Sequence, residues 1–374
     1  MKNFFKYIFC LSLTLALIFS LSACSENEGS DAGSEKTVTV IDHAGNEVTL
    51  PENPQRIVVC DILPMPSVLA VFFDSAEKIV GMSSTSMSAA ENSLLSELYP
   101  EILNAETGFI NGTEVNTEEL LKLAPDVVFY SASTPALGEK LTAAGFNAVA
   151  ISANKWEYDC IETLENWISL ISQIYPDNDK TAVVAEYSSE AYELVQSRVK
   201  DLPEDEREEV FFLFKYSETD MMTSGCSFFG QWWMNAIGAV NVAEELTQDN
   251  QVSVNMEQVY EWDPDKILIT NFTTALPEDI YGNTIGNCNW SGIEAVADKE
   301  VYKMPLGMYR SYTPGADTPV TLLWMAKTVY PQLFEDIDIT EYTIDYYEAV
   351  FGITLTKEQA ESIFVPAGSA AEGF

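Results

Sequence analysis

The sequence predicts an α/β protein in which two doubly wound lobes are joined by one long helix. Short apolar runs alternate with helical stretches in both halves of the chain, and a long helical stretch separates the halves. In addition, VNTEELLKLAPDVVFY at 115–130 has a near repeat in VNMEQVYEWDPDKILI at 254–269. Both phrases carry Asn-x-Glu, then Pro-Asp, then an apolar run. A phrase shared by the two halves indicates two similarly built lobes.

The first 36 residues have the pattern of an export signal and a tether. Lys2 and Lys6 precede an apolar stretch of signal-peptide length, which is short for a bilayer-spanning helix of about 20 apolar residues. The following Leu-Ser-Ala-Cys24 resembles a lipobox, so residues 1–23 are expected to be a lipoprotein signal peptide and Cys24 to carry the lipid. An uncleaved anchor helix is the alternative. Residues 24–36 are small and polar and are predicted to form a flexible tether. The protein is therefore expected at the cell membrane, lipid-anchored and facing outside the cytoplasm.

Residues 37–157 are predicted to form the N-terminal α/β lobe. Residues 37–50 alternate apolar and polar residues around Gly45-Asn46, which is typical of a hairpin. Four short apolar runs of the kind buried in parallel sheets follow, at 56–61, 78–82, 126–130 and 147–151. Helical stretches at 117–123 and 136–145 separate them, and Gly145 is placed to end the second.

The pattern becomes helical over residues 158–203, which we interpret as the connection that contains the interlobe helix. Its longest part, 179–202, has apolar residues at helical spacing and no internal Gly or Pro. Strands are predicted again at 209–214, 266–270 and 301–305, with helices at 228–239, 256–262 and 319–330. Residues 204–364 are therefore assigned to the C-terminal α/β lobe, and 365–374 to a flexible tail.

The amino-acid composition disfavours several kinds of binding partner. The chain has 58 acidic and 19 basic residues, a formal charge of −39, which disfavours nucleic acid and anionic lipid surfaces. Besides Cys24 and a cysteine in the signal peptide, four cysteines remain, without CxxC or zinc-like spacing. A disulfide between Cys226 and Cys288 and free buried thiols both stay open.

Catalytic and metal-binding motifs are missing from the sequence. The one histidine, His43, lies in the predicted hairpin and is expected to be exposed, which disfavours a His-ligated metal or haem. Tyr or Met ligation of haem iron stays open. No GxSxG, HExxH or phosphate-loop motif is present. We therefore expect neither an enzyme, nor a metal site, nor a bound cofactor. A surface glycosidase with paired carboxylates, and an adhesin or sensor, are the competing classes.

Several segments resemble, in order, the periplasmic binding proteins that serve ABC importers of iron-siderophore complexes and vitamin B12. They are IDHAGNEVTLPENPQRIV (41–58), KIVGM (78–82), NTEELLKLAPDVV (116–128), NMEQVYEWDPDKILI (255–269), ADKEVYKMP (297–305) and LLWMAKTVYPQLF (322–334). The resemblance implies a ligand cleft between two lobes joined by one rigid helix. It also implies an importer permease with its ATPase as partner, and a monomer is expected.

By the same resemblance, Glu118 and Glu257 are expected to dock with permease arginines. A carboxylate at a helix start is favoured by the helix dipole and meets arginine in a bidentate manner. The alternative is an ordinary acidic residue in the first helical turn, with Asn116 or Asn255 as cap.

The ligand cleft is expected beyond the carboxyl ends of the strands, as in open α/β sheets. The residues that follow the apolar runs are rich in aromatic and Met side chains, which suits a bulky chelate held by stacking and a few polar contacts. The predicted ligand-binding residues are Met65, Tyr130, Tyr216, Trp232, Trp233, Trp290, Tyr309, Arg310 and Tyr312. Further candidates in the same loops are Asp61, Met82, Met87, Ser131, Lys215, Asn271, Phe272 and Met308. Because consecutive helix residues diverge by about 100°, one of Trp232 and Trp233 is expected to be core.

Arg310 is the basic residue that is predicted to bind the ligand. It lies in MYRSYTPG, after the strand at 301–305, and its guanidinium suits a carboxylate, catecholate or hydroxamate oxygen of a metal chelate. A surface salt bridge is the alternative. A ferric siderophore is the leading ligand, with corrinoid, haem, another metal chelate and an oxyanion as alternatives.

Overall fold

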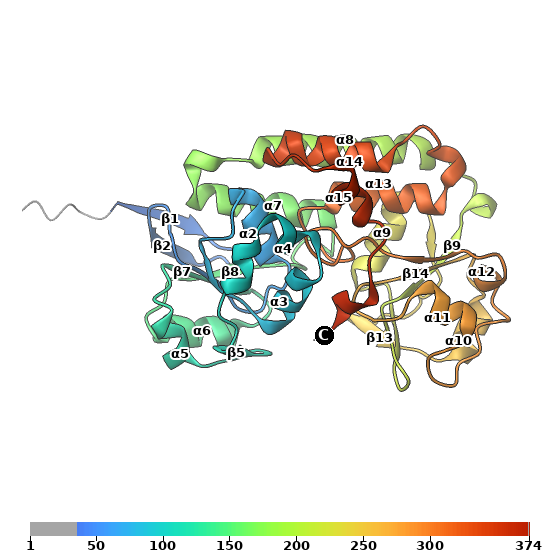
Figure 1. Cartoon of the computed structure of the whole chain (residues 1–374), viewed down its shortest axis with the longest axis horizontal. Coiled ribbons are helices and arrows are strands. Elements are labelled where there is room, and N and C mark those ends of the chain that lie inside the picture. The colour runs from blue at the N-terminus through green and yellow to red at the C-terminus, as the bar shows by residue number, and fades with distance from the viewer. Residues whose placement is uncertain (1–35, 373) are drawn as a thin grey trace, which may run out of the picture. The chain divides into compact units, whose positions relative to one another are not determined.

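Two separate four-stranded parallel sheets, one in each half of the chain, form the two lobes of the computed structural model, which describes residues 36–372 and 374 (Figure 1). Residues 37–374 form one compact unit. The predicted signal peptide, Cys24 and almost all of the predicted tether lie outside the described residues. In the part of the chain that is described, no helix is both long enough and apolar enough to cross a bilayer.

The sheet of the N-terminal lobe has the strand order β4-β3-β7-β8 and is parallel throughout. Its strands are β3 (Ile57–Val59), β4 (Ile79–Gly81), β7 (Val127–Ser131) and β8 (Ala148–Ile151). They are rich in Val and Ile and almost wholly buried, as strands covered on both faces must be. The predicted strands are therefore confirmed to within about two residues at each end.

Helices and two hairpins surround this sheet. The helices are α2 (Met65–Phe73), α3 (Ser84–Glu91), α4 (Leu94–Leu98), α5 (Thr117–Lys122) and α6 (Pro135–Ala143). The hairpins are β1 (Thr37–Ile41) with β2 (Glu47–Pro51), and β5 (Ile110–Asn111) with β6 (Glu114–Val115). Gly45 turns the first hairpin at a φ of 87°, a left-handed conformation that glycine adopts without strain. The predicted opening hairpin is thus confirmed.

The C-terminal lobe repeats this construction. Its parallel sheet has the order β12-β9-β14-β15, from strands Val240–Asn241, Glu209–Leu213, Lys266–Ile269 and Val301–Lys303. Its helices are α9 (Phe229–Ile237), α10 (Met256–Trp262), α11 (Pro277–Gly282) and α12 (Glu294–Ala297). A small antiparallel sheet is added by β10 (Lys215–Tyr216), β11 (Met221–Ser224) and β13 (Gln251–Ser253).

The lobes are connected by α7 (Cys160–Ile174) and the 19-residue α8 (Thr181–Val199), which Figure 1 shows running along the top of both lobes. At 1.5 Å per residue α8 is about 28 Å long. The helix α13 (Thr318–Val329) packs against α8, and α14 (Ile339–Tyr346) packs against α13. The predicted α/β architecture with one long connecting helix is confirmed.

The end of the chain departs from the predicted division into lobes. Tyr346, Tyr347 and Phe351, from α14 and the π-helical turn Tyr347–Phe351, belong to the same hydrophobic core as the N-terminal sheet, although 204–364 was assigned to the C-terminal lobe. After α15 (Lys357–Ser362), residues Gly368–Ala371 form a 3-10 turn in which Ala370 and Ala371 are buried. The predicted flexible tail thus contains an ordered turn that packs against α3, and its flexibility stays a prediction.

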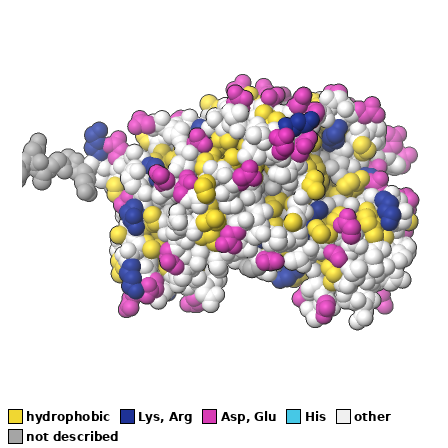
Figure 2. Space-filling model, in the orientation of Figure 1, with side chains coloured by type: hydrophobic (Ala, Val, Ile, Leu, Met, Phe, Trp, Pro, Cys, Tyr) yellow, Lys and Arg dark blue, Asp and Glu magenta, His cyan; other side chains and the backbone are white. Residues whose placement is uncertain are grey.

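On the face seen in Figure 2, acidic side chains are spread out without forming a single block. Figure 2 shows them scattered across both lobes, with far fewer basic side chains on the same face. The lower outline of this view is indented between the lobes. A dispersed acidic surface favours solubility and guides encounters over the Debye length of about 8–10 Å, without determining what an enclosed cavity holds.

Candidate ligand-binding cleft

A cavity of about 290 Å³ lies between the two lobes, at the carboxyl ends of their strands. The N-terminal lobe contributes Asp61, which follows β3, and Ser131, which ends β7. The C-terminal lobe contributes Phe214 after β9 and Phe272 after β14. This is the position at which open α/β sheets bind ligands, and the prediction of its location follows the same rule.

Aromatic rings dominate the C-terminal wall of this cavity. Phe228 and Phe229 lie at the start of α9, and the rings of Phe214 and Phe272 are stacked with centroids 5.0 Å apart. Tyr309 lines the same wall. An apolar, aromatic wall suits a ligand with rings or a chelate with an apolar surface, whose contacts come from stacking.

The polar side of the cavity is already hydrogen-bonded within the protein. One oxygen of Asp61 accepts from the backbone N–H of Ser131 at 2.6 Å, and the other accepts from the hydroxyl of Thr134 at 2.7 Å. The carboxylate therefore ties the end of β3 to the loop after β7. These bonds satisfy Asp61 and reduce its need for a cationic partner.

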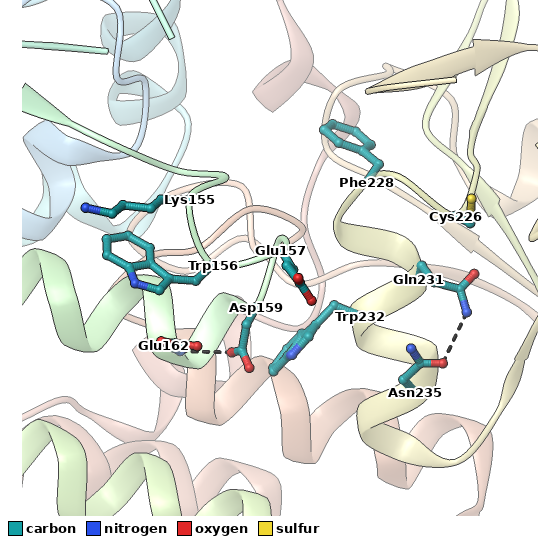
Figure 3. Close-up of a pocket in the computed structure, with 10 residues that line it drawn as sticks. All are labelled: Lys155, Trp156, Glu157, Asp159, Glu162, Cys226, Phe228, Gln231, Trp232 and Asn235. Atoms are coloured by element: carbon teal, nitrogen blue, oxygen red, sulfur yellow. Dashed lines mark hydrogen bonds between the residues drawn. The ribbon is translucent and has the colours of Figure 1, made fainter. Parts of the chain in front are cut away.

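A second cavity of about 570 Å³ lies beside the first, and Phe228 lines both (Figure 3). Figure 3 shows the loop before α7 on one side, with Lys155 and Trp156, and α9 on the other, with Trp232. The two cavities form the interlobe cleft of this structure.

The loop before α7 has an unusual backbone. Glu157 and Tyr158 are consecutive non-glycine residues with φ of 51° and 63°. Each such residue costs of order 1 kcal/mol and persists where surrounding contacts hold it in place. Here the Tyr158 ring contacts Phe228 and Phe229 edge-on, at centroid distances of 5.8 and 5.2 Å. The strained loop therefore brings the N-terminal lobe into direct contact with the aromatic wall of the C-terminal lobe.

Arg310 is completely buried behind this wall. Its Nε and Nη2 donate to the carbonyl oxygen of Ala370 at 3.1 and 2.9 Å, and its Nη1 donates to the hydroxyl of Tyr309 at 3.1 Å. Its guanidinium carbon lies 5.2 to 5.6 Å from the ring centroids of Phe272, Tyr309 and Phe374. The predicted position after β15 is correct, but the side chain is covered, because Ala370 and Phe374 lie against the guanidinium.

The positive charge of Arg310 has no carboxylate partner among the described residues. The ion pairs found among the described residues involve Lys122, Arg198, Lys266 and Lys357, and none involves Arg310. The alternative of a surface salt bridge is therefore wrong. A buried cation without a counter-charge is costly, and neutral oxygens and aromatic faces compensate only part of that cost. Burial also raises the pKa of Tyr309, against the opposing effect of Arg310, so the phenol beside the guanidinium stays neutral.

The structure separates the predicted ligand residues into two groups. Tyr309 lines the smaller cavity and Trp232 the larger one, while Arg310 lies behind the wall. The others are Met65, Tyr130, Tyr216, Trp233, Trp290 and Tyr312, which belong to the hydrophobic cores and line neither of these two cavities. Their role in ligand binding stays a prediction.

The local structure explains why these residues lie outside the two cavities. Met65 begins α2 and faces the core of the N-terminal lobe. Tyr130 precedes Ser131 in β7, and since consecutive strand residues face opposite sides, Ser131 lines the cleft while Tyr130 borders a groove beside α6. The indole of Trp290 donates to the hydroxyl of Tyr216 at 3.1 Å inside the C-terminal lobe. The hydroxyl of Tyr312 accepts from the backbone N–H of Gly230, which places this ring beneath α9.

Several cleft residues were not among the predicted site residues. They are Leu63, Pro64, Lys155, Trp156, Phe228, Phe229, Gln231, Asn235, Thr313, Pro314 and Phe374. Trp156 follows β8 by a few residues, so the rule that ligands lie beyond strand ends could have found it. Phe374 gives no such signal in the sequence.

Asn116 and Asn255 are helix caps, as the alternative interpretation of the repeated phrase states. The side chain of Asn116 accepts from the backbone N–H of Glu118 at 3.0 Å, and Asn255 forms a capping box with Gln258. Glu118 and Glu257 are exposed in the first turns of α5 and α10. Figure 1 places both helices at the bottom of the lobes, away from α8. Their role in docking stays a prediction.

The histidine and the cysteines have structural positions. His43 is half-buried rather than exposed; its Nδ1 accepts from the backbone N–H of Ser152 at 3.1 Å, and its ring meets Trp156 edge-on. Burial, and secondarily Lys155, lowers the pKa of His43 to about 4. Among the described cysteines, Cys60, Cys160, Cys226 and Cys288 are all free thiols, so the possible Cys226–Cys288 disulfide is not formed. No group of three or more potential metal ligands occurs within residues 36–372.

Comparison with known proteins identifies the family. Residues 67–306 match the family model for periplasmic binding proteins. The molybdate-binding protein MolA of Haemophilus influenzae is 26% identical over 341 residues, which cover 86% of this chain and 93% of MolA. Its molybdate-bound structure has a TM-score of 0.71, with 25% identity, 85% coverage of this chain and 99% of MolA.

Other solved structures agree with this assignment. A periplasmic solute-binding protein of Veillonella parvula is 28% identical with a TM-score of 0.78, covering 88% of this chain and 97% of its own. CeuE of Helicobacter pylori, solved with Ni-His, is 20% identical with a TM-score of 0.67 over 87% of this chain and 98% of its own, which supports the fold alone. The predicted family is confirmed: the chain belongs to the periplasmic binding proteins, the extracytoplasmic solute-binding proteins of ABC importers.

Proposed function

We propose that this protein captures a small metal-containing oxyanion of the molybdate class in the interlobe cleft and delivers it to its importer. The observation that carries the proposal is the buried guanidinium of Arg310, which has no carboxylate partner among the described residues. An anion at this position would supply the missing charge, and bidentate arginine–oxyanion hydrogen bonds are among the strong ones in proteins.

Two further observations support an oxyanion. The cavity of about 290 Å³ is at the lower limit of typical ligand pockets, which favours a small solute over a large chelate. The relative MolA, 26% identical over most of both chains, binds molybdate. The leading ligand therefore changes from the ferric siderophore expected from the sequence to an oxyanion.

An organic metal chelate, such as a ferric siderophore, is the second candidate. The stacked rings of Phe214 and Phe272 and the nearby Phe228 and Phe229 form an apolar wall that a bare oxyanion does not need. The neighbouring cavity of about 570 Å³ adds room for a larger ligand. Both candidates would present an anionic edge to Arg310, as would the propionates of haem and the phosphodiester of a corrinoid, which stay alternatives.

We further propose that the protein acts by binding rather than catalysis and is anchored through a lipid on Cys24. In the smaller cavity the carboxylate of Asp61 is hydrogen-bonded to Ser131 and Thr134, which gives it a structural role in joining two loops. The lipobox-like Leu-Ser-Ala-Cys24 supports the anchor.

Thermal unfolding with a panel of ligands tests the proposed function. Sodium molybdate, a ferric hydroxamate siderophore, haemin and cobalamin are each added to purified protein. A ligand at 100 times its Kd stabilises the folded state by about 2.7 kcal/mol, which raises Tm measurably. Stabilisation by molybdate and not by the siderophore supports the oxyanion, the reverse result supports the chelate, and stabilisation by neither contradicts both.

A further inference from the structure

The segment that covers Arg310, residues 366–372 together with Phe374, touches both lobes. Its 3-10 turn packs against α3, and the hydroxyl of Ser88 in α3 donates to the carbonyl of Glu372. On the other lobe, the carbonyl of Ala370 accepts from Arg310, and the ring of Phe374 meets Phe272 edge-on at 4.6 Å. Figure 1 shows the end of the chain descending between the lobes to a point beside α3 and β13. We call residues 366–372 and Phe374 the covering segment.

Few buried contacts hold the covering segment in place. Val365, which precedes it, is 81% exposed, and among its described residues only Ala370 and Ala371 are buried. Phe374 remains 40% exposed although it contacts the cavity wall. Segments with few buried apolar contacts open at low free-energy cost.

The carbonyl of Ala370 occupies the position at which a ligand would bind Arg310. It accepts from both Nε and Nη2, the two parallel donors to which an oxyanion would present two of its oxygens. A carbonyl oxygen carries no net charge, whereas hydrogen bonds between charged groups are about twice as strong. An oxyanion is therefore the better partner for the same two donors.

We propose that the covering segment is an internal competitor of the ligand: Ala370 and Phe374 close the Arg310 site in the unliganded protein, and the anion displaces them. This inference rests on the proposed function. Since the segment contacts α3 as well as the C-terminal lobe, its release also frees one contact between the lobes.

Gly368 allows the segment to be dislodged without altering Arg310. A Cβ at this position would lie 2.3 Å from the backbone oxygen of Thr274, a contact that a side-chain rotation cannot relieve. Gly368→Ala should therefore push the segment away. A chain ending at Val365 removes the segment entirely and serves as the second variant. Ser369→Ala is the matched control, because it changes the neighbouring residue by removing one hydroxyl.

Two measurements distinguish a failure of this inference from a failure of the proposed function. The first is modification of Arg310 by an arginine-specific dicarbonyl reagent, followed by mass spectrometry without any ligand. The exposed Arg56 and Arg207 are internal controls. The second is calorimetric titration with sodium molybdate.

In Gly368→Ala and in the shortened chain, we expect modification of Arg310 to rise roughly tenfold and molybdate to bind roughly tenfold more tightly, equivalent to about 1.4 kcal/mol. Ser369→Ala should match the unchanged protein in both. Unchanged modification of Arg310 in both variants would overturn the inference, and so would increased modification with unchanged or weaker molybdate binding. Increased modification with no molybdate binding in any form would support the cover over Arg310 and contradict molybdate as the ligand.

Discussion

Trp232 and Trp233 are neighbours in α9 with ring centroids 4.8 Å apart, yet they lie in different surroundings. Trp233 is completely buried and its indole donates to the carbonyl of Tyr312 at 2.9 Å. Trp232 is half-buried and lines the larger cavity of the cleft. The positions of the two rings agree with the expectation that one of them is core, and the contact of Trp232 with a ligand stays a prediction.

This difference predicts unequal effects of truncation. Trp233→Ala should lower the free energy of unfolding by about 3–5 kcal/mol, because it leaves a cavity in a packed core. Trp232→Ala should lower it by less than about 1.5 kcal/mol, since its ring faces open space. Urea unfolding of both variants measures the two values, and equal losses would contradict the assignment of Trp232 to the cleft.

Reversing the charge at the exposed helix starts should impair import. Glu118→Arg and Glu257→Arg place positive charge where permease arginines are expected, so each should reduce uptake of labelled ligand in cells. Ligand affinity should change little, because neither residue lines the cleft cavities. Glu193→Arg is the matched control, an exposed helix glutamate on α8 at the other side of the molecule. Normal uptake by the double variant, or loss of ligand affinity in either single variant, would count against docking.

The pKa of His43 can be measured without assignment because it is the only histidine. Burial lowers it to about 4, so the imidazole proton signals in NMR spectra of untagged protein should titrate near pH 4, well below the usual 6.5. A midpoint above pH 6 would show that the ring is solvated.

The lowered pKa of His43 also makes the free energy of unfolding depend on pH. As pH falls below 6.5, the unfolded state binds the proton first, so the contribution of His43 is fully present above pH 6.5 and is lost between pH 6.5 and 4. Relative to His43→Gln, the unchanged protein should lose roughly 1–3 kcal/mol of unfolding free energy across this range. Parallel pH profiles of the two proteins would contradict this.

Anchoring through Cys24 predicts that Cys24→Ala abolishes lipid attachment. The lipobox-like sequence needs the thiol as acceptor, so the variant should remain uncleaved or be released from the membrane. Metabolic labelling with a fatty-acid analogue measures this. Labelling that persisted in Cys24→Ala would exclude the proposed anchor.

The fold was predictable because its signals are local. Runs such as those around Val127–Ser131 and Lys266–Ile269 are apolar and short, and helical spacing over Thr181–Val199 is unbroken. The location of the cleft followed from the strand ends. The direction of individual side chains could not be predicted in the same way. Tyr130 and Ser131 are adjacent in β7, and a shift of one residue decides which of them faces the cleft.

The cover over Arg310 was not predictable for a different reason. The sequence around Ala370 is composed of small residues without apolar periodicity, which is also the pattern of a flexible end. Its position depends on long-range contacts, with Ser88 on one side and Arg310 on the other. Such contacts leave no pattern in the segment itself.

The central claim, an anion site at Arg310, is tested most directly by calorimetric titration of sodium molybdate into the unchanged protein, Arg310→Ala and Arg310→Lys. Arg198→Ala is the control, because Arg198 pairs with Asp336 away from the cleft cavities. A charge-assisted contact is worth about 1.5–3 kcal/mol, so Arg310→Ala should bind roughly tenfold to a hundredfold more weakly. Arg310→Lys should recover only part of the loss, since a point charge lacks the planar fork of donors. Melting of each variant confirms that it is folded, which matters because Arg310 is buried. Molybdate affinity that is the same in folded Arg310→Ala as in the unchanged protein would contradict the claim.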